Sequence, residues 1–173
     1  MTAPLVPPVD LVVNAAELLR QPGGHRRVVT EIALGAVDLD DARLTGDVAV
    51  DVTLESTLDD VVVTGFLRVG RHDACRRCLR PIDDVLEVRV DERYRVDPAA
   101  ADDAFPIVNG QIDLAPMVRE EVLLAIPDAP LCRPDCPGLC PICGAELAEG
   151  PCGCDTTVRD ERWAVLDQLR IED

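Results

Sequence analysis

Eight cysteines with short, regular spacing constrain this chain more than any other feature of its sequence. Six of them fall between residues 131 and 154, where proline and glycine are frequent and apolar side chains are few. A segment of that composition cannot order itself by burying a hydrophobic core, so another interaction must hold it together. Thiols paired at tight turns are a common way to present ligands to tetrahedral zinc. The cysteines are Cys75, Cys78, Cys132, Cys136, Cys140, Cys143, Cys152 and Cys154.

The spacing of these cysteines suggests how they divide between metal ions. Cys140 and Cys143 with Cys152 and Cys154 predict one four-sulfur site that resembles a zinc ribbon. The other four cysteines would form a second site that ties the early pair to the late segment. A single site drawn from the six late cysteines, with the early pair free or partnered differently, is the alternative. One or two zinc ions are therefore expected, and their role is structural, because all-thiolate sites are closed whereas catalytic zinc needs an open coordination position.

The remaining sequence predicts an α+β fold, with an antiparallel β-sheet or partly open barrel and a few covering helices. Apolar residues alternate with polar ones in three runs, as in strands that are buried on one face. These runs cover residues 48–54, 61–69 and 86–96. The pair Cys75 and Cys78 then lies at the tip of a hairpin that joins two long strands. Residues 97–110, rich in Ala, Asp and Pro, are expected to form a loop.

Helices are expected at three places. Asn14 can cap a short helix over 14–20, and Asp113 can cap a longer one that ends before Pro127. A third amphipathic pattern runs from 160 to 171 and contains Trp163, the one tryptophan. The expected organisation is an extended arm over 1–9, an α+β core over 10–130, and a zinc-binding segment with a C-terminal helix over 131–173.

Charge is distributed unevenly along the chain. The net charge is −16, from 33 acidic residues and 17 basic ones, all of them arginine. Such a field repels phosphate backbones and attracts basic surfaces, which argues against a protein that coats nucleic acid. Between Arg68 and Arg80, however, five arginines accompany a single acid, Asp73. This local excess of positive charge coincides with the first cysteine pair.

The sequence favours a cytoplasmic protein without catalytic activity. Its first ten residues lack the basic and apolar regions of a secretory signal, and no apolar run is long enough to cross a bilayer. Phosphate-binding, dinucleotide-binding, esterase and metalloprotease motifs do not occur, and neither histidine has metal-ligand spacing, so no small-molecule substrate is expected. A thiol-redox role of Cys75-Arg-Arg-Cys78 is the alternative. Arginines lower a thiol pKa, but redox pairs begin a helix, whereas strands flank this pair.

Several motifs, in this order, resemble the YceD family. They are Gly65-Phe-Leu-Arg-Val69, Cys75-Arg-Arg-Cys-Leu-Arg-Pro81, Gln111-Ile-Asp-Leu114, Glu121-Val-Leu-Leu-Ala-Ile-Pro127, Leu131-Cys-Arg-Pro-Asp-Cys-Pro-Gly-Leu-Cys-Pro-Ile-Cys-Gly144, Cys152-Gly-Cys154 and Asp160-Glu-Arg-Trp-Ala-Val-Leu166. The resemblance implies a factor needed for normal accumulation of large-subunit (23S) ribosomal RNA, without an assigned catalytic activity. Its partners would be large-subunit precursors, through ribosomal RNA, basic ribosomal proteins or both.

The arginines near the first cysteine pair suggest how such a protein could bind ribosomal RNA. Arg71, Arg76, Arg77 and Arg80 are candidate contacts to ribosomal RNA phosphates, while the acidic remainder would face basic ribosomal proteins. An ordinary solvated hairpin tip is the alternative for these side chains. A zinc-ribbon adaptor that binds a protein and makes no RNA contact is the alternative for the whole chain.

Overall fold

The computed structural model describes residues 11–20, 22–58, 60–96, 98, 103–155 and 162. Their contacts separate the chain into two compact units. The sheet unit lies within residues 1–73 and 82–128, and the cysteine unit lies within residues 74–81 and 129–173. The arm predicted over 1–9 and the helix predicted over 160–171, with Trp163, lie outside the described residues apart from Arg162.

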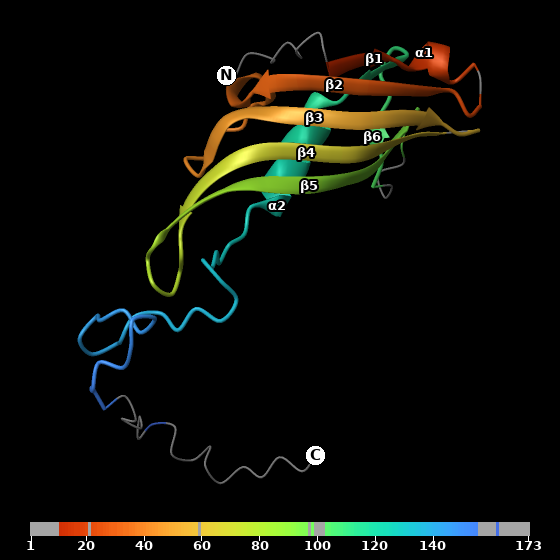
Figure 1. The fold of residues 1–173 in the computed structure, drawn as a ribbon. Coiled ribbons are helices and arrows are strands. Elements are labelled where there is room, and N and C mark those ends of the chain that lie inside the picture. The colour runs from red at the N-terminus through yellow and green to blue at the C-terminus, as the bar shows by residue number, and fades with distance from the viewer. Residues whose placement is uncertain are drawn as a thin grey trace, which may run out of the picture. The chain divides into compact units, whose positions relative to one another are not determined.

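A five-stranded sheet forms the body of the sheet unit (Figure 1). In spatial order its strands are β2 (His25–Ala33), β3 (Leu44–Ser56), β4 (Asp60–Ala74), β5 (Pro81–Arg95) and β6 (Phe105–Pro106). The pairs β2–β3 and β3–β4 are antiparallel, whereas β6 lies parallel to β5. Because β2 and β6 are the edge strands, the sheet does not close on itself within the described residues. The α+β prediction with a largely antiparallel sheet is therefore confirmed, and the barrel form finds no support.

The alternation of buried and exposed residues along β3 and β4 shows which face of the sheet packs against the core. In β3 the buried positions include Val48, Val50, Val52 and Leu54. In β4 they include Val61, Val63, Leu67 and Val69, so both runs turn the same face to the core, as their sequence period predicts. Helix α2 (Ala115–Ala125) lies across this face and buries Met117, Val118 and Val122 (Figure 1).

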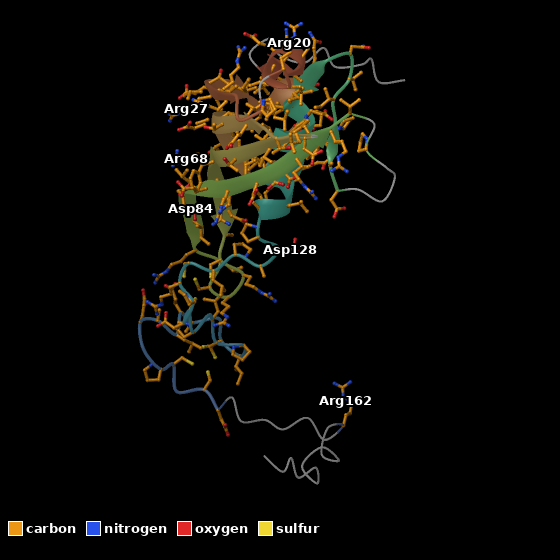
Figure 2. The ribbon with its side chains drawn as sticks, turned by 90° about the vertical axis from the view of Figure 1, so that its right-hand side faces the viewer. Arg20, Arg27, Arg68, Asp84, Asp128 and Arg162 are labelled. Atoms are coloured by element: carbon orange, nitrogen blue, oxygen red, sulfur yellow. The ribbon has the colours of Figure 1, made fainter. Side chains whose placement is uncertain are left out.

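The opposite face of the sheet carries ion pairs between neighbouring strands. Arg27 on β2 binds Asp51 on β3 through two hydrogen bonds of 2.8 Å, and Arg68 on β4 binds Glu87 on β5 at 2.7 Å. Arg27 and Arg68 lie along the same side of the sheet in Figure 2. Polar outward positions and apolar inward positions are the expected pattern for an antiparallel sheet with one solvated face.

Small elements complete the sheet unit. Strands β1 (Val12–Asn14) and β7 (Gln111–Asp113) form a second, two-stranded antiparallel sheet. Helix α1 (Ala15–Leu18) begins at Asn14, whose side chain accepts a hydrogen bond from the Glu17 N–H, so the predicted cap is confirmed. The short 3-10 helix η2 (Leu34–Val37) follows β2.

Two details of the predicted elements are wrong. The cap of α2 is Leu114, not Asp113. Asp113 lies one residue earlier, and its carboxylate still accepts a hydrogen bond of 2.9 Å from the Ala115 N–H. The stretch expected as a loop over 97–110 contains β6, which is held by the stacking of Phe105 on Tyr94, with ring centroids 5.2 Å apart.

Candidate metal centre

The first cysteine cluster joins two distant parts of the chain within the cysteine unit. Cys75 and Cys78 come from the turn between β4 and β5, as predicted, and Cys132 and Cys136 come from the segment after α2. The four sulfur atoms lie within 4.8 Å of one another. The Cys75 and Cys136 sulfurs are 3.8 Å apart, and those of Cys78 and Cys132 are 3.7 Å apart.

The second cluster comes from one continuous stretch. Cys140, Cys143, Cys152 and Cys154 bring their sulfur atoms within 4.8 Å of one another. All eight cysteines are free thiols, and the two clusters are the sets that the ribbon-like spacing suggested. The alternative of a single site from the six late cysteines does not match this grouping.

Each cluster contains a knuckle, here meaning the tight turn that runs from its first cysteine through the five following residues, 75–80 and 140–145. In the first knuckle the Leu79 N–H donates to the Cys75 carbonyl at 2.8 Å, and the Cys75 N–H donates to the Arg80 carbonyl at 2.8 Å. In the second, the Gly144 N–H donates to the Cys140 carbonyl at 2.9 Å. The Cys140 N–H likewise donates to the carbonyl of the residue five positions later, at 2.8 Å. The two turns thus have the same backbone hydrogen bonds.

Backbone amides stabilise the thiolate form of one cysteine in each cluster. Backbone N–H groups, that of Cys132 foremost, lower the pKa of Cys75 to about 6. Those of Cys143 and Ile142 do the same for Cys140, whose pKa also falls to about 6. Burial raises the pKa of Cys132 to about 12, and the hydrogen bond with Cys143 raises that of Cys154 to about 12. Because metal ligands must be deprotonated, Cys75 and Cys140 are the cysteines whose backbone surroundings favour metal binding.

Hydrophobic burial contributes little to the cysteine unit. Every member of the hydrophobic core cluster belongs to the sheet unit. Among the described residues of the cysteine unit, the buried ones are four cysteines and Gly138. Its order must therefore come from hydrogen bonds and from whatever the sulfur atoms bind.

The distances fit a tetrahedral ion. Four sulfurs at about 2.3 Å from one ion lie about 3.8 Å from each other. The separations of 3.7 and 3.8 Å in the first cluster match this value, whereas a disulfide would bring two sulfurs to about 2.0 Å. Each cluster could thus hold a metal ion, and both fit a zinc-ribbon-like segment. With four protein ligands such a site is closed to substrate.

A few polar contacts connect the first knuckle to residues 136–146. The Arg77 side chain donates to the Cys136 carbonyl at 2.8 Å, and the Leu139 N–H donates to the Arg77 carbonyl at 3.1 Å. Gly138 adopts a φ of +79°, and a Cβ there would lie 3.0 Å from the Arg77 carbonyl oxygen. Arg80 forms an ion pair with Glu146. These contacts could not be predicted from local sequence patterns, because they join residues more than 50 positions apart.

The four arginines predicted to contact RNA differ in their environment. Arg71 belongs to the sheet unit, its side chain is only 9% exposed, and it binds Asp84 through hydrogen bonds of 2.9 and 2.6 Å. This pairing does not fit a phosphate contact, so Arg71 is not among the proposed RNA contacts. Arg76, Arg77 and Arg80 are exposed on the first knuckle. The side chain of Arg76 has no ion pair or hydrogen bond within the described residues.

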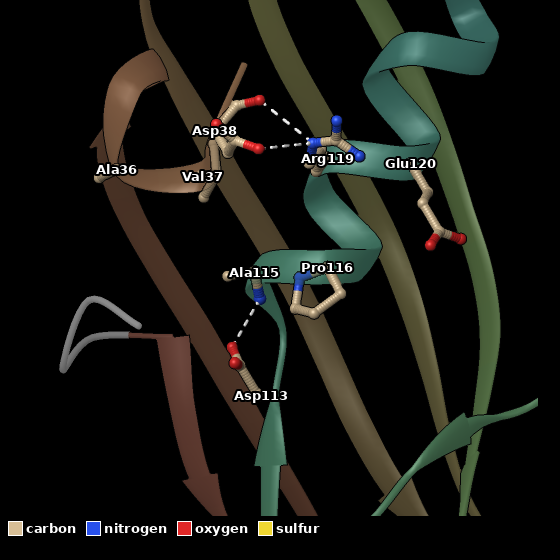
Figure 3. Close-up of a pocket in the computed structure, with 8 residues that line it drawn as sticks. All are labelled: Ala36, Val37, Asp38, Asp113, Ala115, Pro116, Arg119 and Glu120. Atoms are coloured by element: carbon tan, nitrogen blue, oxygen red, sulfur yellow. Dashed lines mark hydrogen bonds and ion pairs between the residues drawn. The ribbon is translucent and has the colours of Figure 1, made fainter. Parts of the chain in front are cut away.

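The surface also offers a pocket of about 350 Å³ between η2 and the start of α2 (Figure 3). Three of its charged residues contact neighbours: Arg119 binds the Asp38 carbonyl at 3.1 Å and faces the Asp38 carboxylate, and Asp113 accepts a hydrogen bond from the Ala115 N–H. Ala36, Val37 and Pro116 line the rest. No lining residue pairs a nucleophile with a base, so the cysteine clusters remain the candidate site.

Comparison with known proteins gives one family. The family model described as large ribosomal RNA subunit accumulation protein YceD matches residues 63–170. Uncharacterized proteins of Mycobacterium tuberculosis and Mycobacterium bovis are 33% identical over 171 residues, covering 92% of this chain and 81% of each relative. One from Mycobacterium leprae is 29% identical over 178 residues, covering 98% and 81%. No solved structure gives a significant match. No helix in the described part of the chain has the length and apolar character needed to span a membrane.

Proposed function

Because the chain belongs to the YceD family of large ribosomal RNA subunit accumulation proteins, we propose that it promotes accumulation of 23S ribosomal RNA by binding large-subunit precursor particles. Binding alone, without catalysis, is the proposed mode of action. It is supported by closed sulfur clusters, which leave no coordination position for a substrate. The cytoplasm, where these particles assemble, is the proposed location.

Two structural zinc ions are part of the proposal. Zinc accepts four thiolates in a tetrahedron without preference for other geometries, and the sulfur separations of 3.7 and 3.8 Å suit it. Cys75, Cys78, Cys132 and Cys136 would hold one ion, and Cys140, Cys143, Cys152 and Cys154 the other. The metal would shape the first knuckle, which its own apolar contacts cannot do.

The proposed RNA contact is the knuckle tip, defined as Arg76, Arg77, Leu79 and Arg80. Three guanidinium groups and no carboxylate lie between Cys75 and Pro81, in a molecule whose net charge is −16. Arginine binds phosphate through a planar set of donors, and the acidic remainder suits basic ribosomal proteins. The observation that carries the proposal is this exposed turn with three arginines, which contains two of the four cysteines of the first cluster.

The net charge of −16 favours a second candidate, an adaptor that binds a protein and makes no RNA contact. Crosslinking in cells separates the two. Recovery of 23S precursor RNA supports the first proposal, and recovery of a protein without RNA supports the adaptor.

The RNA contact is tested with the double variant Arg76→Ala, Arg77→Ala. Arg80 is kept because its removal would leave Glu146 unpaired, and metal content is measured in the double variant because Arg77 donates to the Cys136 carbonyl. Association with purified precursor particles should weaken, and the slope of log affinity against log salt should fall by about 1.5 for two lost phosphate contacts. The control is Arg89→Ala, Arg93→Ala, which removes the same charge from exposed positions of β5. Unchanged affinity and slope in the first variant, with its metal retained, would refute the contact.

A further inference from the structure

The two knuckles differ at the position that follows their second cysteine. Gly144 occupies it in the second knuckle, with a φ of +72°, and Leu79 occupies it in the first, with a φ of +61°. Both residues donate the same backbone hydrogen bond to the first cysteine of their turn. The turn therefore requires a left-handed residue at this point, and glycine is the residue that adopts this conformation without steric strain.

Leu79 gains no internal packing that would offset its strain. Its side chain is 67% exposed, and it is not part of the hydrophobic core cluster. Strained backbone positions persist at sites where the strained residue has a use. Since the same chain places glycine in the equivalent turn, the metal-binding geometry itself does not call for leucine.

The surroundings of Leu79 indicate what it meets. Arg76, Arg77 and Arg80 share its turn, no acidic residue lies between 74 and 81, and Glu146 pairs with Arg80. This combination suits a ligand that presents negative charge and an apolar surface together. Phosphates of a duplex would engage the arginines alone, because paired bases hide their faces in the stack. Unpaired nucleotides expose both phosphates and base faces.

We infer that the knuckle tip binds unpaired nucleotides of large-subunit RNA, with Leu79 against the face of a base and Arg76 and Arg77 on adjoining phosphates. The inference rests on the proposed function and specifies the RNA that this surface takes. A protein with an apolar pocket ringed by carboxylates is the competing occupant, and the test below includes it as an outcome.

A photo-crosslinker at position 79 identifies the neighbour directly. Full-length protein carrying p-benzoylphenylalanine in place of Leu79 is bound to purified precursor particles and irradiated. Crosslinks to nucleotides that chemical probing shows to be unpaired are the expected result. Crosslinks only to a ribosomal protein, or only to paired nucleotides, would overturn the inference.

Two substitutions separate a binding role from a structural one. Leu79→Ala and Leu79→Gly should each weaken particle association by about tenfold, the loss expected for one apolar contact. Leu79→Gly should at the same time raise the folding equilibrium constant of the knuckle by about tenfold, since it relieves the left-handed strain. A variant that is more stable and yet binds less well cannot be explained by misfolding.

The outcomes distinguish this inference from the proposal beneath it. If Arg76→Ala, Arg77→Ala weakens binding while both Leu79 variants bind as wild type does, the RNA contact stands and the base contact is wrong. If the wild-type protein does not associate with particles, both are wrong. Leu124→Ala serves as the control, because this leucine of α2 is 82% exposed and should have no effect.

Discussion

Replacing Cys140 by serine should remove one metal ion and unfold the second knuckle alone. Serine stays protonated at neutral pH and is a poor zinc ligand, so the cluster loses one of its four donors. The metal content should fall from two ions per chain to one. Cys75→Ser should do the same to the first cluster and leave the second intact.

The structure sets the magnitude of this effect. A structural zinc site contributes about 10–16 kcal/mol of apparent binding free energy, which is folding free energy for the segment it holds. The second knuckle has two backbone hydrogen bonds at its first cysteine, from the N–H groups of Cys140 and Gly144, worth about 1 kcal/mol each. No residue of the hydrophobic core cluster supports it. Hydrogen bonds of about 2 kcal/mol in total cannot replace a metal site.

Native mass spectrometry counts the bound metal ions, and hydrogen exchange on the same sample measures whether each knuckle is folded. In Cys140→Ser the amides of positions 140 and 144 should exchange freely, while those of positions 75 and 79 stay protected. In Cys75→Ser the amides of positions 75 and 79 should exchange freely, while those of positions 140 and 144 stay protected. Sheet-unit amides, such as those of Val50 and Val63, are the internal control in both variants. Two bound ions in Cys140→Ser, or slow exchange of the Gly144 amide after metal loss, would refute the reasoning.

Two further predictions concern the sheet unit. Gly65→Ala should destabilise the sheet unit by about 3 kcal/mol in urea unfolding, because φ is +152° and a Cβ would lie 2.2 Å from the Asp51 carbonyl oxygen. Gly35→Ala, whose Cβ would meet open space, should change the stability of this unit little. Equal effects of the two substitutions would contradict the steric argument. His72 forms a hydrogen bond of 2.6 Å with Asp83, and this contact raises the pKa of His72 above 6.5. The small stabilisation from this exposed pair is therefore complete below pH 6.5 and is lost as the pH rises through the raised pKa. An NMR titration should show this pKa fall in Asp83→Asn, and an unchanged value would exclude the pairing.

Much of the fold follows from sequence period and turn chemistry. The alternating runs around Val50 and Val63 predict strands with one buried face, and Asn14 predicts the start of α1; both are confirmed. The early cysteine pair was placed at the tip of a long hairpin because strand patterns flank it. These signals are local, so a single sequence is enough to read them.

Other parts of the fold depend on contacts that leave no local trace. Strands β1 and β7 have three residues each, too few to show a period. The two-residue strand β6 depends on the stacking of Phe105 on Tyr94 from another strand. Short elements of this kind form because tertiary contacts select them.

In the candidate site, too, some features follow from the local sequence and others depend on tertiary contacts. Cysteine spacing was enough to suggest the two clusters, because metal ligands must converge. Charge counted along the sequence put Arg71 with Arg76 and Arg77, but Arg71 lies on β4 and faces Asp84 on β5. Leu79 could have been noticed from sequence alone, since the second knuckle has glycine where the first has leucine.

The ratio of 23S to 16S ribosomal RNA in cells is the most direct test of the account. It would be measured in cells of the source organism whose sole copy of this protein carries Arg76→Ala and Arg77→Ala, at wild-type protein level and with metal content unchanged. The account predicts a lower ratio than in cells with the wild-type protein, and restoration when the wild-type copy is returned. An equal ratio in the two strains would contradict the claim that this cationic knuckle supports accumulation of large-subunit RNA.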